Sequence, residues 1–437
     1  MKRTICILAA LLVSLFAFAR PFADSVTDAT LRLDYIFSGN ATGASISWLG
    51  SYRTPGWAGR RGNLDSLLLA GNGRIEVLDP ESGEVLYCQS FSTLFQEWQC
   101  TEEATHVTKG FENCFQVPWP KRKVNIRVTL TDNYHRTTAT LTHPVDPSDI
   151  LIRPLKTNCS WRQIRGGGNH AGKVDVAILG DGYAEKDLKK FWADASRTAE
   201  ALLSHEPFAS MKDKFNFVAV AAPSEDSGVS VPHLNSWKRT AFSSHYDTFY
   251  TDRYLTTSSQ RAIFDALAGV PFEIMIILGN TDKYGGGGIY NSVTLVSAGH
   301  RTFRAVTVHE FGHAFAGLGD EYFYDDDYSD TYPDGVEPWE PNITTRTDFA
   351  SKWEDLVAEG AAGLYEGGGY RSKGVWRPAD DCRMRTNECE GFCPVCTRAI
   401  IRMTKYLTEA KKIIIFVSHE NQEGGIRRQQ HKGRSAP

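Results

Sequence analysis

Two histidines and a glutamate, His309, Glu310 and His313, stand at the spacing of an HExxH motif. On a helix, residues four apart project from the same face, so the two imidazoles can hold one Zn²⁺. The carboxylate of Glu310 lies beside them and can take a proton from the water that the metal activates. The pattern therefore predicts a zinc hydrolase, and among zinc hydrolases a peptidase.

The residues around the motif favour a buried metal-binding helix over a chance match. Apolar residues continue through the motif at helical spacing, at Phe303, Val306, Val308, Phe311, Ala314 and Phe315. Burying His309, Glu310 and His313 without partners would cost several kcal/mol, whereas a metal ion would satisfy all three. Gly317 then follows as a typical helix stop.

Two carboxylates follow the helix stop, where a third metal ligand is needed. In the related motif HExxHxxGxxH the third ligand comes three residues after the glycine. The same count gives Asp320 here, although the glycine stands one residue later than in that motif. We therefore predict His309, His313 and Asp320 as the zinc ligands. Glu310 would be the catalytic base, and Glu321 is the alternative third ligand or orients a histidine.

A methionine far along the chain fits the same kind of site. Met384 lies in the segment 381–385, after a long insertion and before a helical C-terminal stretch. In metzincins a methionine turn lies under the zinc site after such a segment. The alternative is an ordinary core methionine.

Eight cysteines remain once Cys6 in the first residues is set aside. An even number in an exported protein favours disulfides, paired within each half of the chain. The last four, which form the pattern C-x6-C-x3-C-x2-C, also allow a second, structural zinc, and we favour disulfides there. The eight are Cys88, Cys100, Cys114, Cys159, Cys382, Cys389, Cys393 and Cys396.

The first 19 residues have the features of a signal peptide. Lys2 and Arg3 precede an apolar run over residues 5–18, which ends in a small-x-small cleavage pattern at Ala19. The run is short for a membrane span of about 20 residues, and no other segment is apolar enough. We expect an exported protein without stable membrane insertion, which is periplasmic, at the cell surface or secreted. The net charge of −4 gives no basic footprint for nucleic acid.

The elements that must position these residues fall into two domains. Residues 20–160 show short alternating segments between turn signals, for example 74–78, 123–128 and 137–141, and predict an all-β sandwich accessory domain. Prolines and a glycine run between 144 and 168 indicate a connecting region. Carbohydrate and protein are both open as ligands of this domain. The sequence does not indicate an oligomeric state.

Residues 161–417 predict an α/β domain with a mainly parallel sheet that carries the active-site helix. Strands are expected at 174–179, 215–222, 272–278 and 289–298, with helices at 185–205 and 259–268. The last strand could present its edge to an extended peptide. The acidic stretch 325–334 predicts a solvated loop rather than a calcium site, and the polar residues 418–437 predict a disordered tail.

Several motifs together resemble the bacterial immunoglobulin-A metallopeptidase family, family sixty-four of the metallopeptidases. They lie at 179–183, 284–286, 309–318, 320–322, 382–384 and 392–396. The resemblance implies a metzincin-like, zinc-dependent peptidase whose catalytic glutamate is Glu310, preceded by a β-rich accessory domain. It does not transfer the immunoglobulin substrate.

The leading interpretation is an exported zinc endopeptidase that acts on host or environmental proteins or glycoproteins, with immunoglobulin A among them. One alternative is a zinc hydrolase of another bond in glycoconjugates. The other is a binding protein or adhesin with an inactive peptidase-like domain. The intact histidines and glutamate argue against loss of activity.

Overall fold

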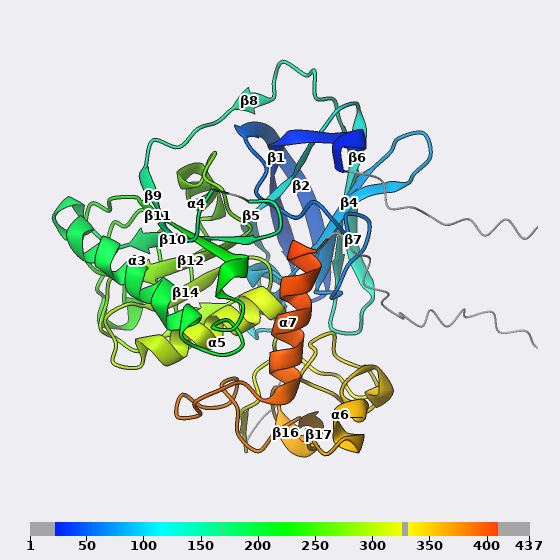
Figure 1. The fold of residues 1–437 in the computed structure, drawn as a ribbon, viewed down its shortest axis with the longest axis vertical. Helices are drawn as coiled ribbons and strands as arrows, with labels where there is room; N and C mark the ends of the chain where they lie inside the picture. The colour runs from blue at the N-terminus through cyan, green and yellow to red at the C-terminus, as the bar shows by residue number, and fades with distance from the viewer. Residues whose placement is uncertain (1–21, 169, 326–330, 410–437) are drawn as a thin grey trace, which may run out of the picture.

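The computed structural model describes residues 22–168, 170–325 and 331–409 (Figure 1). The predicted signal peptide, the polar tail and residues 326–330 of the acidic segment lie outside these residues. The described part has a two-domain architecture. β-Strands of the N-terminal part lie beside a mixed sheet with helices, and helix α7 (Pro394–Thr408) runs along the boundary (Figure 1).

Two four-stranded sheets form the N-terminal part, as the alternating segments predict. The strand orders are β5-β1-β2-β8 and β4-β3-β6-β7. Apolar side chains of both sheets, such as Leu33 on β1 and Ile126 on β6, share one core. The bounds are β1 Val26–Asn40, β2 Gly43–Pro55, β3 Gly73–Leu78, β4 Val85–Phe91, β5 Lys109–Pro120, β6 Val124–Thr131, β7 Thr137–Val145 and β8 Arg153–Pro154. The short helix α2 (Leu94–Gln99), which the sequence did not indicate, follows β4.

The second sheet is mixed, in the order β13-β14-β12-β10-β11-β9. Its four inner strands are parallel, and each edge strand runs antiparallel to its neighbour. The prediction of a mainly parallel sheet is therefore right for the centre and wrong for the edges. The bounds are β9 Ser160–Arg165, β10 Val174–Asp181, β11 Phe215–Ala221, β12 Ile274–Gly279, β13 Gly286–Gly288 and β14 Thr294–Ser297.

Neither edge strand was among the strands that the sequence pattern predicted. The expected connecting region, residues 144–168, contributes β9 to the sheet, and its Pro144 lies in β7. The expected strand at 289–298 is shorter, because a turn at Asn291 (φ 48°) returns the chain from β13 to β14. The glycines at 286–288 themselves form the edge strand β13. A Cβ on Gly288 would lie 2.3 Å from the carbonyl oxygen of Glu310, so side chains have no room there.

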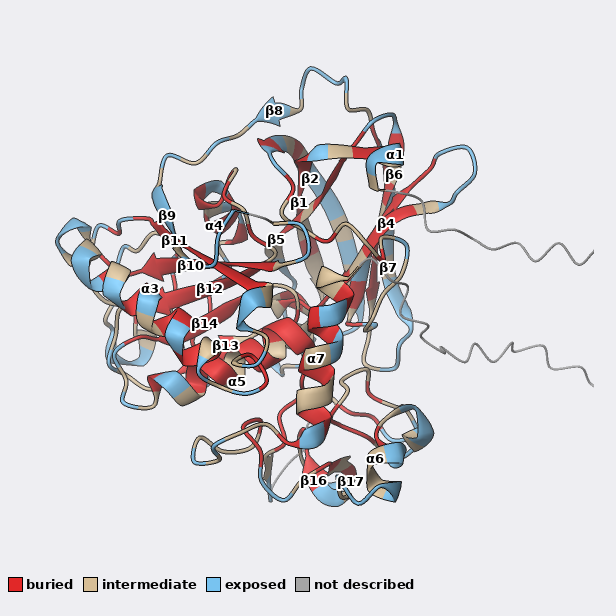
Figure 2. Ribbon diagram, in the orientation of Figure 1, coloured by how far each residue is buried: buried red, intermediate tan, exposed pale blue. Residues whose placement is uncertain are grey.

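Helices cover both faces of the mixed sheet. Helices α3 (Leu188–Leu203), α5 (Phe303–Ala316) and α7 share one core with alternate residues of β10 and β11. Helix α4 (Gln260–Ala266) packs on the other face, towards β5 of the N-terminal part. Figure 2 shows that the inner strands and most of α5 are buried.

A small sheet and one short helix lie between α5 and α7 along the chain. The sheet has the order β15-β17-β16, and its strands are Phe323–Tyr324, Tyr370–Arg377 and Tyr365–Gly368 in that order. With α6 (Glu354–Ala358) it lies beyond the C-terminal end of α5 (Figure 1). None of the described helices is long and apolar enough to cross a bilayer.

Candidate metal centre and catalytic cleft

Helix α5 places both histidines and Glu310 at the wall of a cleft. The helix ends at Gly317, whose φ of +60° turns the chain back. The turn brings Asp320 to the histidines. Its Oδ1 lies 3.1 Å from His309 Nε2 and 3.2 Å from His313 Nε2. The two Nε2 atoms are themselves 3.1 Å apart.

The hydrogen bonds of the His309 and His313 rings show which ring atoms face Asp320 Oδ1. His309 Nδ1 lies 2.9 Å from the carbonyl oxygen of Arg383, and His313 Nδ1 contacts the carbonyl oxygen of Leu318. A carbonyl oxygen only accepts, so each Nδ1 carries a proton and Nε2 of each ring points inward, where its lone pair can bind a metal once the ring is neutral. Asp320 Oδ1 is buried and has no hydrogen-bond donor.

Three electron-pair donors therefore converge on one point, which fits a cation. A tetrahedral zinc ion with bonds of about 2.0 Å would space its ligand atoms about 3.3 Å apart. The three distances, 3.1, 3.1 and 3.2 Å, are close to that value. Two imidazoles and one carboxylate are also a donor set that suits zinc.

The structure separates the two carboxylates that the sequence left as alternatives. Asp320 faces the histidines, and its Oδ2 accepts a hydrogen bond from the Tyr370 hydroxyl. Glu321 turns away, and its Oε1 accepts from Asn342 Nδ2 at 2.9 Å. The geometry thus favours Asp320 as the third ligand.

Charges and burial at this centre oppose one another. Burial would lower the pKa of His313, but the charge and hydrogen bond of Asp320, the charge of Glu310 and the hydrogen bond to Leu318 together outweigh burial and raise this pKa to about 9. Burial would raise the pKa of Asp320, and the two histidines instead hold it well below its usual range. Burial raises the pKa of Glu310. The cluster is a buried anion facing two basic rings, and this field attracts a cation.

Met384 lies under α5, as the sequence pattern predicts. A Cβ on Gly312 would come within 2.9 Å of Met384 Sδ, and Met384 is fully buried. The backbone around it supports the metal centre. Met384 O accepts from the Glu321 N–H at 2.8 Å, and the preceding carbonyl, that of Arg383, accepts from His309.

The cleft in front of the metal centre has walls from both domains. Its volume is about 800 Å³, and it is open to solvent. The N-terminal domain contributes Asn72, Ser92, Thr93, Gln96, Glu97, Cys100 and Asn133. Glu97 of α2 accepts a hydrogen bond from the Tyr254 hydroxyl, which links the two walls, and burial raises the pKa of Glu97 to about 7. Deeper contacts also join the domains, for example Asn63 Nδ2 to Tyr406 O at 2.9 Å.

Sequence reasoning missed these cleft residues. Glu97, Tyr254 and Tyr370 belong to no spacing pattern, and only the packing of distant segments brings them to the site. The edge expected to receive a peptide also differs. β14 is an inner strand, β13 is the edge, and Leu255 N–H already donates to Gly286 O at 3.3 Å, which covers part of that edge.

The predicted disulfides do not form. Among the described residues, Cys88, Cys114, Cys159, Cys382, Cys389, Cys393 and Cys396 are free thiols. Cys382 Sγ and Cys396 Sγ are 3.8 Å apart. A disulfide would need about 2.05 Å. The two sulfurs instead share a buried cluster with Glu321, the carboxylate that turns away from the histidines.

Comparison with known proteins places both halves of the chain in one family. A family model described as IgA Peptidase M64 matches residues 163–362 and 358–404, which include α5 and Met384. A second family model, described as Peptidase M64 N-terminus, matches residues 21–142. A search of the curated proteins found no match. The chain belongs to the IgA peptidase M64 family.

Proposed function

We propose that this peptidase is a zinc-dependent endopeptidase whose metal ligands are His309, His313 and Asp320. The observation that carries the proposal is the convergence of their three ligand atoms within 3.2 Å of one another, beside Glu310 and at the wall of an open cleft. The methionine beneath the helix and the glycine turn before Asp320 support a metzincin-like catalytic domain.

Each residue at the centre has a distinct task in this proposal. Zinc, when bound, would supply a Lewis acid and make a water molecule more acidic. Glu310 accepts the proton of the attacking water and passes it to the leaving amine. Its raised pKa makes its carboxylate a better proton acceptor than an exposed one. The carbonyl groups of Arg383 and Leu318 fix the two rings, and Tyr370 fixes Asp320.

The cleft supports a polypeptide as substrate. It is open to solvent and runs between two domains, so an extended chain can lie across the metal centre. Its walls offer hydrogen-bonding side chains, such as Glu97, and aromatic rings. The guanidinium of Arg253 lies over the ring of Tyr322, 5.6 Å from the ring centre. We propose exported proteins and glycoproteins as the substrate class, with immunoglobulin A as one member to test.

Zinc content and cleavage test the proposal together. The wild type and Glu310→Gln, which keeps the side-chain size, are incubated with a secreted proteome and with immunoglobulin A, and new N-termini are counted by mass spectrometry. We expect equal zinc content at the histidine site and cleavage by the wild type alone.

Other outcomes would decide against it. A wild type that cleaves nothing in either panel would support the inactive binding protein instead. If the Asp320→Ala variant keeps its zinc at the histidine centre, Asp320 is not a metal ligand. Export is tested separately, by locating the protein and sequencing its mature N-terminus, which we expect after Ala19.

A further inference from the structure

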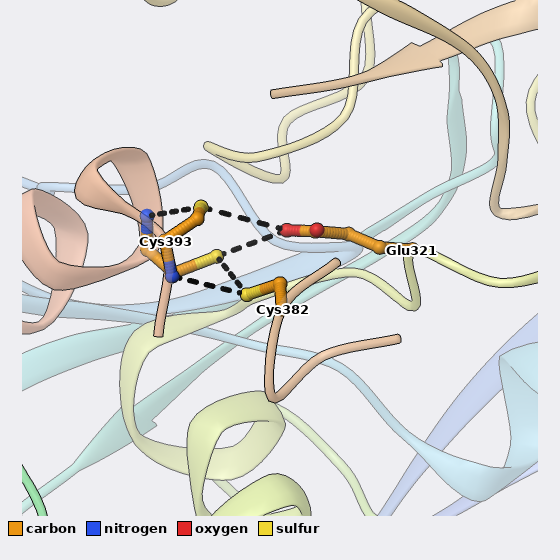
Figure 3. A group of neighbouring side chains, drawn as sticks. Glu321, Cys382 and Cys393 are labelled. Carbon is orange, nitrogen blue, oxygen red and sulfur yellow. Dashed lines mark hydrogen bonds between the residues drawn. The ribbon is translucent and has the colours of Figure 1, made fainter. Parts of the chain in front are cut away.

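A second cluster of metal-binding side chains lies behind the catalytic centre. The ligand atoms of Glu321, Cys382, Cys393 and Cys396 all lie within 4.8 Å of one another (Figure 3). Three of these residues are fully buried, and Cys393 is 6% exposed. They come from the loop after α5, the segment before Met384 and the start of α7.

The distances in the cluster match a tetrahedral metal site. The Sγ atoms of Cys382 and Cys396 are 3.8 Å apart. Glu321 Oε1 lies 3.1 Å from Cys396 Sγ and 3.9 Å from Cys393 Sγ. Zinc with bonds of about 2.3 Å to sulfur and about 2.0 Å to oxygen would place sulfurs about 3.8 Å apart and sulfur–oxygen pairs about 3.5 Å apart.

One polar atom in the cluster lacks the partner that burial demands. Glu321 Oε2 is buried and has no hydrogen-bond partner. A carboxylate buried among thiols is costly, because thiols are weak donors. Backbone N–H groups point at the sulfurs. Cys382 Sγ accepts from Cys393 N at 3.2 Å, and Cys393 Sγ accepts from Cys396 N at 3.4 Å. Such bonds and the N-terminal end of α7 stabilise thiolates, the form that binds a metal.

We propose that Glu321, Cys382, Cys393 and Cys396 bind a second metal ion, zinc in the first place, with a structural role. Four protein ligands fill a tetrahedral shell, which leaves no position for substrate. On binding, the three thiols release their protons to solvent. Cys389 lies outside the cluster and contacts the carbonyl oxygen of Gly391.

The bound metal would hold together the segments that support the catalytic centre. Glu321 follows Asp320 directly, and Cys382 precedes Arg383, whose carbonyl oxygen orients His309. The metal would also protect the thiols from oxidation in an exported protein. This supporting role rests on the proposed function, whereas the metal site itself does not.

Metal content and sulfur coordination test the site in the full chain. The wild type is expected to hold about two zinc ions per chain, and His309→Ala/His313→Ala about one. X-ray absorption at the zinc edge of this double variant is expected to show about three sulfurs at about 2.3 Å and one lighter ligand. Cys393→Ser/Cys396→Ser is expected to lose one zinc, whereas the control Cys389→Ser keeps both.

The readouts separate this inference from the proposed function. A double histidine variant without zinc, wild-type zinc without sulfur neighbours, or a disulfide mapped among the three cysteines would each overturn the second site. The wild-type spectrum decides the question even where the cysteine variants do not fold. Sulfur-bound zinc in a protein that shows no Glu310-dependent cleavage would refute the peptidase mechanism and leave the second site standing.

Discussion

Replacing Gly317 with alanine tests how the end of α5 positions the proposed third ligand. Gly317 has a φ of +60°, and its N–H donates to His313 O at 3.0 Å. A Cβ at this position would lie 2.7 Å from Leu69 Cδ1 and 2.7 Å from Trp339 Cζ3. The substitution therefore adds backbone strain and a collision at the point where the chain turns towards Asp320.

The two effects can be assigned separate magnitudes. A left-handed conformation costs a residue with a Cβ about 1 kcal/mol relative to glycine. Forcing an extra carbon into a packed site costs about 1 to 3 kcal/mol more. We therefore expect Gly317→Ala to lower the free energy of unfolding by about 2 to 4 kcal/mol. Because the turn sets the place of Asp320, we also expect weaker metal binding at the histidines.

A matched control isolates the collision from the strain. Gly335 has a φ of +75°, and a Cβ at this position would have no atom within 4 Å. Gly335→Ala should lose about 1 kcal/mol from strain alone. Both variants are unfolded in urea, and their zinc is titrated with a competing chelator. Equal losses of stability, or unchanged zinc affinity in Gly317→Ala, would refute the reasoning.

Three further predictions concern the cleft. Glu310→Gln should lower kcat/KM by about 10²- to 10⁴-fold at unchanged zinc content, and a variant that keeps its activity would exclude Glu310 as the base. Wild-type activity should rise with pH through the pKa of Glu310, because burial raises that pKa and the base must be ionised. Tyr370→Phe, which removes the hydrogen bond to Asp320 Oδ2, should weaken zinc binding about 10-fold in a chelator titration, and an unchanged affinity would show that this bond does not matter. Burial raises the pKa of Glu97 from 4.5 to about 7, so the folded protein favours its protonated form and loses stability as the pH rises through this range. Glu97→Gln should therefore stabilise the protein at pH 8 relative to its effect at pH 4, measured as the shift in melting temperature, and the opposite sign would contradict the assignment.

The catalytic helix could be predicted from sequence because its signals are local. Apolar spacing from Phe303 onward, the HExxH motif and Gly317 all act within one helix and its cap, and α5 ends at Ala316. The third ligand was harder. Successive side chains of a chain that is not helical point in different directions, and sequence alone does not fix which one faces the metal. Asp320 faces the histidines, and Glu321 faces the cysteines.

The parts that sequence did not predict depend on long-range packing. β9 and β13 lack the alternation or apolar run of a strand, and each exists because an inner strand offers it an edge. The cysteine count suggested disulfides, whereas burial of Glu321 beside three thiols is visible only once three separate segments meet. The contribution of Glu97 to the cleft depends on how two domains pack.

A cleft whose walls belong to two domains has a width that depends on the angle between them. The hydrogen bond from Tyr254 to Glu97 spans the cleft, and contacts such as Asn63 to Tyr406 lie away from it. Substitutions at those distant contacts would tilt one wall against the other and leave α5 untouched. Relatives can therefore differ in the width of substrate they accept through substitutions at the domain interface, while the chemistry on α5 stays the same.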